Sequence, residues 1–390
     1  MKLKSTILTA TLAALMLSPA IAAPKKLLVV TVTTGFRHGP AIDAAEKVLP
    51  EIAAKSNGEL AFELLSEPGP RPNAGKAPTR GKKMTDAEWD SAQATFKTAQ
   101  EKAKADGPAW DAKVKELFAA RLSPAALTNY DGVIFCNTTG ELPLPDGEGL
   151  VNWVKSGKAF VGMHAATDTL KQMQPYYEMI NGSFAGHLWH AGGTYTFTNH
   201  EPSHPTVAMF PASFEWKDEI YQYSHYNPES VRVLLSLDMV KTEPHAPYHV
   251  PVSWVRDVGA GRLFYTNLGH NPETWTNETY QKHITTGIRW ALKMIDGPAQ
   301  PNPAVSAKQS IKSFSATVGL LLSIKGDELE KKGLEKAKAD PKWALKFWQD
   351  ADAYRTLPTP DPKKATPEEL AKAGTAKSEL IKRLMGELEK

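Results

Sequence analysis

Histidines and carboxylates follow four short apolar runs of this 390-residue chain. The first run, residues 27–33, is continuous and rich in β-branched side chains, which is typical of a strand buried on both faces of a parallel sheet. In such a sheet, ligands bind outside the carboxyl ends of the strands, where the chain order reverses. His and carboxylate side chains there can act as acids, bases or metal ligands. We therefore expect one functional crevice formed by the residues after these strands, which are His38, Glu141, His164, Asp168 and His270.

One of these residues lies in the sequence Gly162-Met163-His164-Ala165-Ala166, directly after an apolar run. A buried strand, a tight turn between small residues and a following helix together form a nucleophile elbow. In that geometry we expect the central side chain to project alone into the crevice and to pack little. An imidazole at this position can serve as a general base or a metal ligand. The alternative is a histidine that only hydrogen-bonds the start of the helix.

A second pair of histidines, His187 and His190, lies three residues apart. On a helix or turn, this spacing puts both imidazoles on one face, where they could hold a divalent ion such as zinc. The alternative is an amphipathic loop that lines the pocket. Farther along the chain, Asp218 and Glu219 precede a tyrosine-rich run, which would suit a carbohydrate platform or an apolar wall.

The order of the predicted elements indicates an α/β domain over residues 24–297. Strands are predicted over 27–33, 60–65, 132–137, 159–163, 194–198, 231–237, 250–255 and 262–267, and helices over 40–55, 148–156 and around 284–292. Strands that alternate with helices predict a doubly wound, mostly parallel sheet.

Two segments depart from this alternation. Residues 67–83 are rich in Pro, Gly and basic side chains, and residues 84–120 have a long polar helical pattern, so we interpret 67–120 as a helical insertion. A Pro-rich linker begins at residue 298 and leads into a Lys/Glu-rich tail that ends at residue 390. We interpret this tail as a helical C-terminal extension with a solvated surface.

The first 22 residues have the features of a secretory signal peptide. Two lysines precede an apolar run over 6–17, and small residues follow at 20–22. The run is too short to span a bilayer, and no later stretch has the length and apolarity of a membrane helix. We therefore predict an exported protein, located in a bacterial periplasm. With 46 basic and 43 acidic side chains, the chain offers no electrostatic case for binding nucleic acid.

Five motifs of the chain resemble the trehalose-utilisation (ThuA-like) family. They are Gly35–His38, Asn137–Glu141, Phe160–Asp168, Phe184–His187 and Leu268–His270. The resemblance extends over residues 26–295 and implies a flavodoxin-like fold related to class I glutamine amidotransferases. It also implies a role in sugar metabolism, with disaccharides and their 3-keto derivatives as the substrate class.

Those amidotransferases use a cysteine at the elbow, activated by a His and a Glu. This chain has His164 at that position, and His270 and Glu273 occur in a sequence reminiscent of the amidotransferase His and Glu. The single cysteine, Cys136, falls within a predicted strand, where we expect a small buried hydrophobe. Glutamine hydrolysis by the thiolate route is therefore excluded.

Two functions are compatible with these residues. The first is an enzyme that acts on a small-molecule carbohydrate by hydrolysis, isomerisation or lyase chemistry, assisted by a divalent metal such as zinc. His164 would be the base or a metal ligand, Glu141 and Asp168 would be acid/base or orienting groups, and His38 and His270 would be polar walls of the pocket. The alternative is a non-catalytic sugar-binding or scaffold protein on an amidotransferase-like fold.

Overall fold

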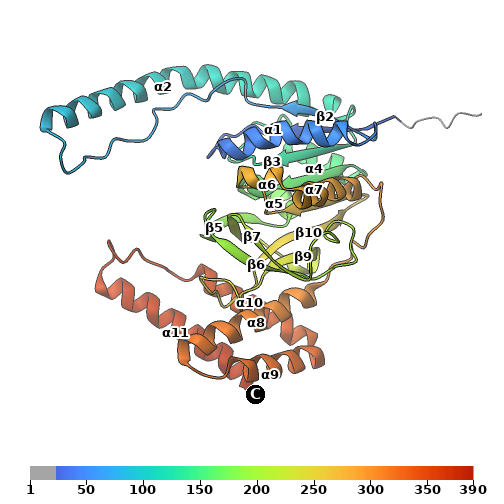
Figure 1. Ribbon diagram of the computed structural model, residues 1–390, viewed down its shortest axis with the longest axis vertical. Helices are drawn as coiled ribbons and strands as arrows, with labels where there is room; N and C mark the ends of the chain where they lie inside the picture. Colours follow the sequence, from blue (N-terminus) through green and yellow to red (C-terminus); the bar gives the residue numbers. More distant parts are fainter. Residues whose placement is uncertain (1–22, 390) are drawn as a thin grey trace, which may run out of the picture.

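A nine-stranded sheet forms the centre of the molecule in the computed structural model, which describes residues 23–389 (Figure 1). The predicted signal peptide lies outside the described residues. The sheet has the strand order β2-β1-β3-β4-β11-β10-β9-β6-β7. Its strands are β1 (Lys25–Val30), β2 (Leu60–Leu65), β3 (Gly132–Cys136), β4 (Ala159–Met163), β6 (Thr194–Asn199), β7 (Ser213–Lys217), β9 (Arg232–Leu237), β10 (Pro251–Val258) and β11 (Gly261–Thr266).

The direction of the strands changes across the sheet. The five strands from β2 to β11 run parallel, and the four strands from β10 to β7 continue the sheet antiparallel. The parallel part has the 2-1-3-4-5 order of flavodoxin-like folds, which places a topological switch point between β1 and β3. A separate two-stranded sheet pairs β5 (Ser183–Trp189) with β8 (Ile220–Ser224) antiparallel.

Helices cover both faces of the parallel strands. They are α1 (Gly39–Ala54), α2 (Asp86–Leu122), α3 (Pro124–Leu127), α4 (Gly147–Lys155), α5 (Gln174–Ile180), α6 (Pro272–Thr276) and α7 (Glu278–Ala291), with 3₁₀ turns η1 (His164–Asp168) and η2 (Pro228–Ser230). On β1, Leu27 and Val29 pack in one apolar core with α1 and α7, whereas Leu28 and Val30 pack in a second core with α4 and α5. Because alternate side chains of a strand face opposite sides, one apolar run supplies both cores. The predicted doubly wound α/β fold is confirmed.

The eight predicted strands are present, with small shifts at their ends, and β5, β7 and β8 were missed. The expectation that His187 and His190 lie on a helix or turn was wrong. His187 lies within β5, and His190 follows its last residue. Pairing with β8 makes this segment a strand, although its pairing is irregular on both sides of Gly186. That pairing partner is distant in sequence, so local periodicity does not reveal it.

The insertion is dominated by α2, which begins with a capping box formed by Thr85 and Glu88. Its buried side chains lie only toward its C-terminal end and are Trp110, Val114, Phe118 and Leu122. The earlier turns have no such apolar stripe, and α2 extends beyond the body of the molecule (Figure 1). The predicted helical insertion is therefore present, anchored at one end.

The C-terminal extension forms four helices, which are α8 (Pro303–Leu322), α9 (Gly326–Ala339), α10 (Pro341–Thr356) and α11 (Pro367–Glu389). They pack below the antiparallel part of the sheet, with α8 against β9 (Figure 1). Asn302 fixes the start of α8, because its Oδ1 accepts from Val233 N at 2.7 Å and its Nδ2 donates to Val233 O at 3.0 Å. Within residues 23–389, no helix combines the length and the apolarity needed to cross a membrane.

Candidate functional site

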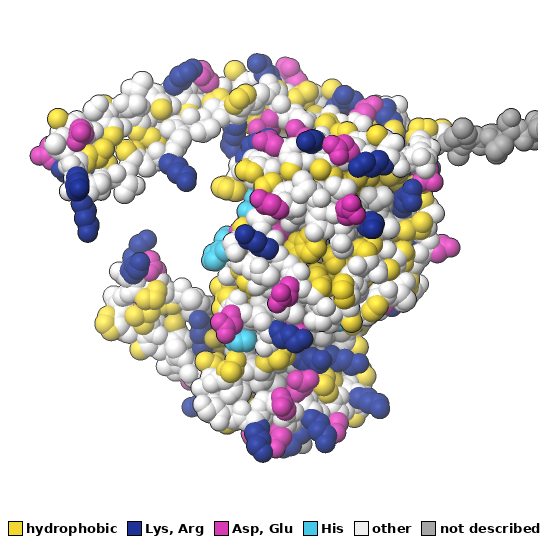
Figure 2. All heavy atoms as spheres, viewed as in Figure 1, with side chains coloured by type: hydrophobic (Ala, Val, Ile, Leu, Met, Phe, Trp, Pro, Cys, Tyr) yellow, Lys and Arg dark blue, Asp and Glu magenta, His cyan; other side chains and the backbone are white. Residues whose placement is uncertain are grey.

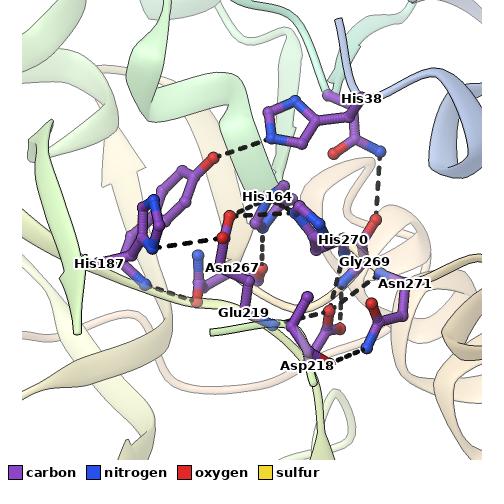
Figure 3. A network of polar contacts seen from close by, with 12 residues as sticks. His38, His164, His187, Asp218, Glu219, Asn267, Gly269, His270 and Asn271 are labelled. Carbon is purple, nitrogen blue, oxygen red and sulfur yellow. Dashed lines mark hydrogen bonds and ion pairs between the residues drawn. The ribbon is translucent and has the colours of Figure 1, made fainter. Parts of the chain in front are cut away.

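Four side chains from distant parts of the sequence meet at the carboxyl edge of the parallel strands (Figure 3). His38 precedes α1, His164 begins η1 directly after β4, and His270 follows β11. Glu219 lies in the short connection between β7 and β8. Each of the four offers one ligand atom, and these atoms lie within 4.8 Å of one another. The structure thus brings together three of the predicted site residues and adds Glu219; we call this group the four-residue cluster.

A close contact between the loops after β1 and β3 positions His38. Gly140 has a φ of +81°, and a Cβ atom at this residue would lie 2.5 Å from the backbone nitrogen of Gly35. Only glycine combines this conformation with so close an approach of two backbones. Thr139 Oγ1 then donates to the carbonyl of Phe36 at 2.6 Å. The switch point of the sheet therefore holds the loop that carries His38.

His164 has the backbone conformation of an elbow. Its φ of +46° lies in the left-handed region, which is rare for residues other than glycine and is typical of strained functional turns. Its Nδ1 lies 2.7 Å from the carbonyl oxygen of Asn267. A carbonyl only accepts, so Nδ1–H donates and Nε2 keeps its lone pair. The imidazole is therefore held in the tautomer that leaves Nε2 available to a proton or a metal.

The expectation that His164 projects alone was wrong, because its side chain is fully buried. Its ring centroid lies 4.5 Å from that of Tyr221, 5.0 Å from that of His38 and 5.1 Å from that of His270. The small residues that follow His164 leave room around the ring, and loops from elsewhere in the sequence fill that room. The elbow is present, but its side chain belongs to a packed group.

The carboxylate of Glu219 is the partner of two of these histidines. Its Oε2 lies 3.0 Å from His270 Nδ1 and 3.7 Å from His164 Nε2, and the two histidine nitrogens are 3.2 Å apart. Glu219 is only 8% exposed, so these interactions are largely shielded from water. The carboxylate that pairs with His270 is thus Glu219. It is not Glu273, which the resemblance to the amidotransferase His and Glu had suggested.

Asp218 holds the loop that carries His270. It is fully buried, and its two carboxylate oxygens accept five hydrogen bonds. The donors are the backbone nitrogens of Glu219 (3.0 Å), Gly269 (2.8 Å), His270 (3.1 Å) and Asn271 (3.0 Å), and the hydroxyl of Thr274 (3.0 Å). Because Asp218 binds both its own neighbour and the loop after β11, it fixes Glu219 against His270 (Figure 3).

Burial dominates the protonation equilibria of the site. Burial, followed by the charge of His270, lowers the pKa of His38 to about 4. Burial and the charges of His38 and His270 lower the pKa of His164 well below its usual value. Burial alone would raise the pKa of Glu219, but the hydrogen bond and charge of His270 outweigh it and lower that pKa. Burial alone would lower the pKa of His270, but the hydrogen bond and charge of Glu219 outweigh it and raise that pKa. The cluster thus presents two neutral imidazoles, His38 and His164, beside an ionised carboxylate paired with His270.

His38 has a nitrogen without a partner. Its Nε2 lies 3.3 Å from the hydroxyl of Tyr221, whereas its Nδ1 is buried and has no hydrogen-bond partner among the described residues. A buried polar atom without a partner is costly and indicates a ligand, water or ion at that position. When Nε2–H donates to Tyr221, the lone pair of Nδ1 is free to bind a cation.

His187 and His190 adjoin the four-residue cluster. Their Nδ1 atoms are 3.2 Å apart, and His187 Nδ1 lies 3.4 Å from Oε1 of Glu219. Ligand atoms of these two histidines and Glu219 lie within 4.8 Å of one another. Figure 2 shows histidine side chains on the concave side of the molecule, between the protruding end of α2 and the C-terminal helices.

The two other predicted site residues have other partners. Glu141 is exposed, and its carboxylate accepts from Gln172 N at 3.3 Å. Asp168 pairs with Lys171 at 2.7 Å. Glu219 was missed because it lies between β7 and β8, and neither strand was predicted. The adjacent acidic pair before a tyrosine-rich run was the available signal.

The fold and site define a flavodoxin-like α/β protein with a histidine- and carboxylate-rich centre at its switch point. The family model described as ThuA, trehalose utilisation, matches residues 80–291, and the chain belongs to this family. The match includes His164, His187, Glu219 and His270 but begins after His38. It links the chain to carbohydrate metabolism.

No curated protein matches the chain. A crystal structure of a ThuA-like protein from Bacteroides uniformis is 18% identical, with a TM-score of 0.46, and covers 70% of this chain and 95% of its own. A ThuA-like protein from Parabacteroides merdae is 15% identical, with a TM-score of 0.46, and covers 72% of this chain and 98% of its own.

Proposed function

We propose that this chain is an exported enzyme of carbohydrate metabolism that acts on a disaccharide or keto-sugar at a histidine-centred, metal-assisted site. Export rests on the signal-like residues 1–22. The carbohydrate class rests on the family, which is described by trehalose utilisation. The metal-assisted site rests on the four-residue cluster.

The convergence of three imidazoles and one carboxylate is the observation that carries the proposal. Their ligand atoms lie within 4.8 Å of one another. Neutral imidazole and carboxylate are the ligands that Zn²⁺ and similar ions prefer in catalytic sites. His164 also donates its Nδ1–H to a backbone carbonyl at 2.7 Å, which is the usual support of a metal-binding histidine.

Proton transfer beside a carbonyl is the chemistry that we favour, which makes the enzyme an isomerase or lyase of a keto-sugar. A bound divalent ion would polarise the carbonyl oxygen and acidify the neighbouring carbon. Glycoside hydrolysis usually needs two carboxylates that flank the bond. Glu219 is the one carboxylate in the four-residue cluster, and both oxygens of Asp218 are occupied by five donors.

An aromatic side chain at the edge of the site supports a sugar as substrate. Phe36 is 69% exposed, and its ring lies edge-on to His38 with centroids 4.9 Å apart. Ligand pockets are commonly lined by aromatic side chains beside a few polar groups. We propose that Phe36 packs against the apolar face of a sugar ring.

The test combines metal analysis with a substrate screen. The purified protein is expected to retain a divalent ion and to convert a disaccharide, or its 3-keto derivative, in a reaction followed by NMR. Removal of the ion with a chelator should abolish turnover, and re-addition should restore it. His164→Asn should lose ion and turnover, whereas the matched His225→Asn, which changes a histidine stacked on Tyr177, should keep both.

Other results would contradict the proposal in distinct ways. A protein that binds sugar, but binds no ion and converts no substrate, would be the non-catalytic sugar-binding protein. A His164→Asn protein with full ion content and turnover would place the chemistry outside the four-residue cluster. If the exported product still carried residues 1–22, the proposed signal cleavage would be wrong.

A further inference from the structure

Glu219 faces two separate groups of histidines with its two oxygens. Oε2 lies 3.0 Å from His270 Nδ1 and 3.7 Å from His164 Nε2. Oε1 lies 3.4 Å from His187 Nδ1. Figure 3 shows the carboxylate between His187 on one side and His164 with His270 on the other. One carboxylate therefore contacts ligand atoms on both sides.

The Nδ1 atom of His187 lies close to two polar atoms, but it can form a good hydrogen bond with only one of them. Its Nδ1 lies 3.2 Å from His190 Nδ1 and 3.4 Å from Glu219 Oε1. A ring nitrogen carries either one proton or one lone pair in the ring plane, so it makes one well-directed hydrogen bond. A cation at the centre of the three atoms would instead satisfy all of them. Two imidazoles and a carboxylate are a common ligand set for catalytic zinc.

We infer that His187, His190 and Glu219 bind a second divalent ion, and that Glu219 bridges it to the ion of the four-residue cluster. This inference rests on the proposed function, because a bridge requires the first ion. A carboxylate with one oxygen directed to each ion is well suited to hold two ions about 3.5–4 Å apart, the usual spacing of two-metal centres. The centre would then use five histidines and one glutamate.

Irregular structure around β5 positions the second ligand set. Gly186 has a φ of +134°, and the pairing of β5 with β8 shifts register on both sides of this residue. Bulges of this kind re-aim side chains next to active sites. The hydroxyl of Tyr195 donates to the carbonyl of His190 at 2.9 Å, which holds the residue after the strand. The ring of Phe184 stacks on that of His187, with centroids 6.1 Å apart.

The two ligand sets differ in exposure, and this difference assigns them different roles. His164 is fully buried, whereas the His187 side chain is 36% exposed and His190 is exposed. A site with three protein ligands and access to solvent keeps an open position for water or substrate. The second ion is thus the one that would bind the adjacent carbonyl or hydroxyl oxygens of a sugar.

Metal stoichiometry and electron paramagnetic resonance test this inference. The mature chain is stripped with a chelator, titrated with Mn²⁺ or Zn²⁺, and analysed for bound metal per chain. The unmodified protein should bind two equivalents, and its Mn²⁺ form should give the spectrum of a spin-coupled pair. His190→Asn should bind one equivalent and give an isolated Mn²⁺ signal. His225→Asn, the matched control outside both ligand sets, should keep two coupled ions.

The possible failures are distinguishable. One ion in the unmodified protein and an unchanged ion in His190→Asn would overturn the second site while leaving the proposed function intact. Two ions without spin coupling would overturn the bridge. No bound ion in the unmodified protein would overturn the proposed function itself. Because His190 is exposed, its replacement should leave the melting curve of the metal-free protein unchanged, so lost metal cannot be attributed to unfolding.

Discussion

The two parts of the fold that build the site hold their side chains differently. The loops at the carboxyl ends of the parallel strands supply His38, His164 and His270, which pack closely against one another. The small β5–β8 sheet and the connections at its ends supply His187, His190 and Glu219. The first part is largely enclosed by protein, whereas the two histidines of the second are accessible. The enclosed part of the site is built on the large sheet, and the accessible part is built on the small β5–β8 sheet.

The junction between these parts is the adjacent pair Asp218 and Glu219. Asp218 is directed at the backbone of the loop after β11, and Glu219 is directed at the histidines. Asp218 therefore supports the structure of the loop, whereas Glu219 contacts the histidines of the site. Substitutions should separate these roles. Those in the enclosed part should lower the free energy of unfolding most, and those in the accessible part should lower it least.

Asp218→Ala should have the largest effect. It removes a buried acceptor of five hydrogen bonds and leaves the backbone nitrogens of Gly269, His270 and Asn271 without partners. Loss of one member of such a buried charged network costs about 3–5 kcal/mol. Urea unfolding should show this decrease in the free energy of unfolding. Asp218→Asn, which keeps an acceptor oxygen, should lose less. Equal stability of Asp218→Ala and the unmodified protein would show that the loop after β11 is held by other contacts.

His164→Ala should be next. The side chain is fully buried, and its removal leaves a cavity and an unpaired carbonyl at Asn267. These two effects together should cost about 2–3 kcal/mol. The matched variant His164→Asn should be less destabilised, because asparagine tolerates the positive φ and keeps a polar side chain. Both should lose bound metal. If His164→Ala kept the stability of the unmodified protein, the ring would be loosely held after all.

The residues of the enclosed part could be predicted from the sequence because they follow the strands of a parallel sheet. Continuous apolar runs predict buried parallel strands, and the carboxyl ends of those strands share one edge. His38, His164 and His270 were found by this rule. Glu141 follows a strand in the same way, but its side chain points to solvent. Strand order fixes where a residue lies along an edge, and not where its side chain points.

The residues of the accessible part could be predicted only in fragments. The spacing of His187 and His190 indicated a pair, but the conformation that joins them depends on the pairing of β5 with β8. Glu219 contacts both groups only because this small sheet folds over the edge of the large one. No local pattern encodes such a contact, since it depends on side chains far apart in sequence.

Phe36→Ala should affect binding and leave stability nearly unchanged. The side chain is 69% exposed, so its truncation should change the free energy of unfolding by less than about 0.5 kcal/mol. Loss of an aromatic packing surface should weaken the binding of the disaccharide identified in the screen by about 3- to 10-fold. Isothermal titration calorimetry measures the Kd. Phe36→Tyr, which keeps the ring, should bind normally. Unchanged binding by Phe36→Ala would remove this side chain from the sugar site.

His187→Ala should have the smallest effect on stability and tests the accessible part directly. Its side chain is 36% exposed, and its contacts are the stacked ring of Phe184, His190 and the outer oxygen of Glu219. A substitution at so open a position should change the free energy of unfolding of the metal-free protein by less than about 0.5 kcal/mol. With metal present, the unmodified protein should gain stability that the variant gains only in part, because ions that bind the native state stabilise it in proportion to their occupancy. Thermal melts with and without Zn²⁺ measure both quantities. A variant that is already destabilised without metal would show that His187 supports the β5–β8 sheet, and the contrast between an enclosed structural part and an accessible chemical part would no longer hold.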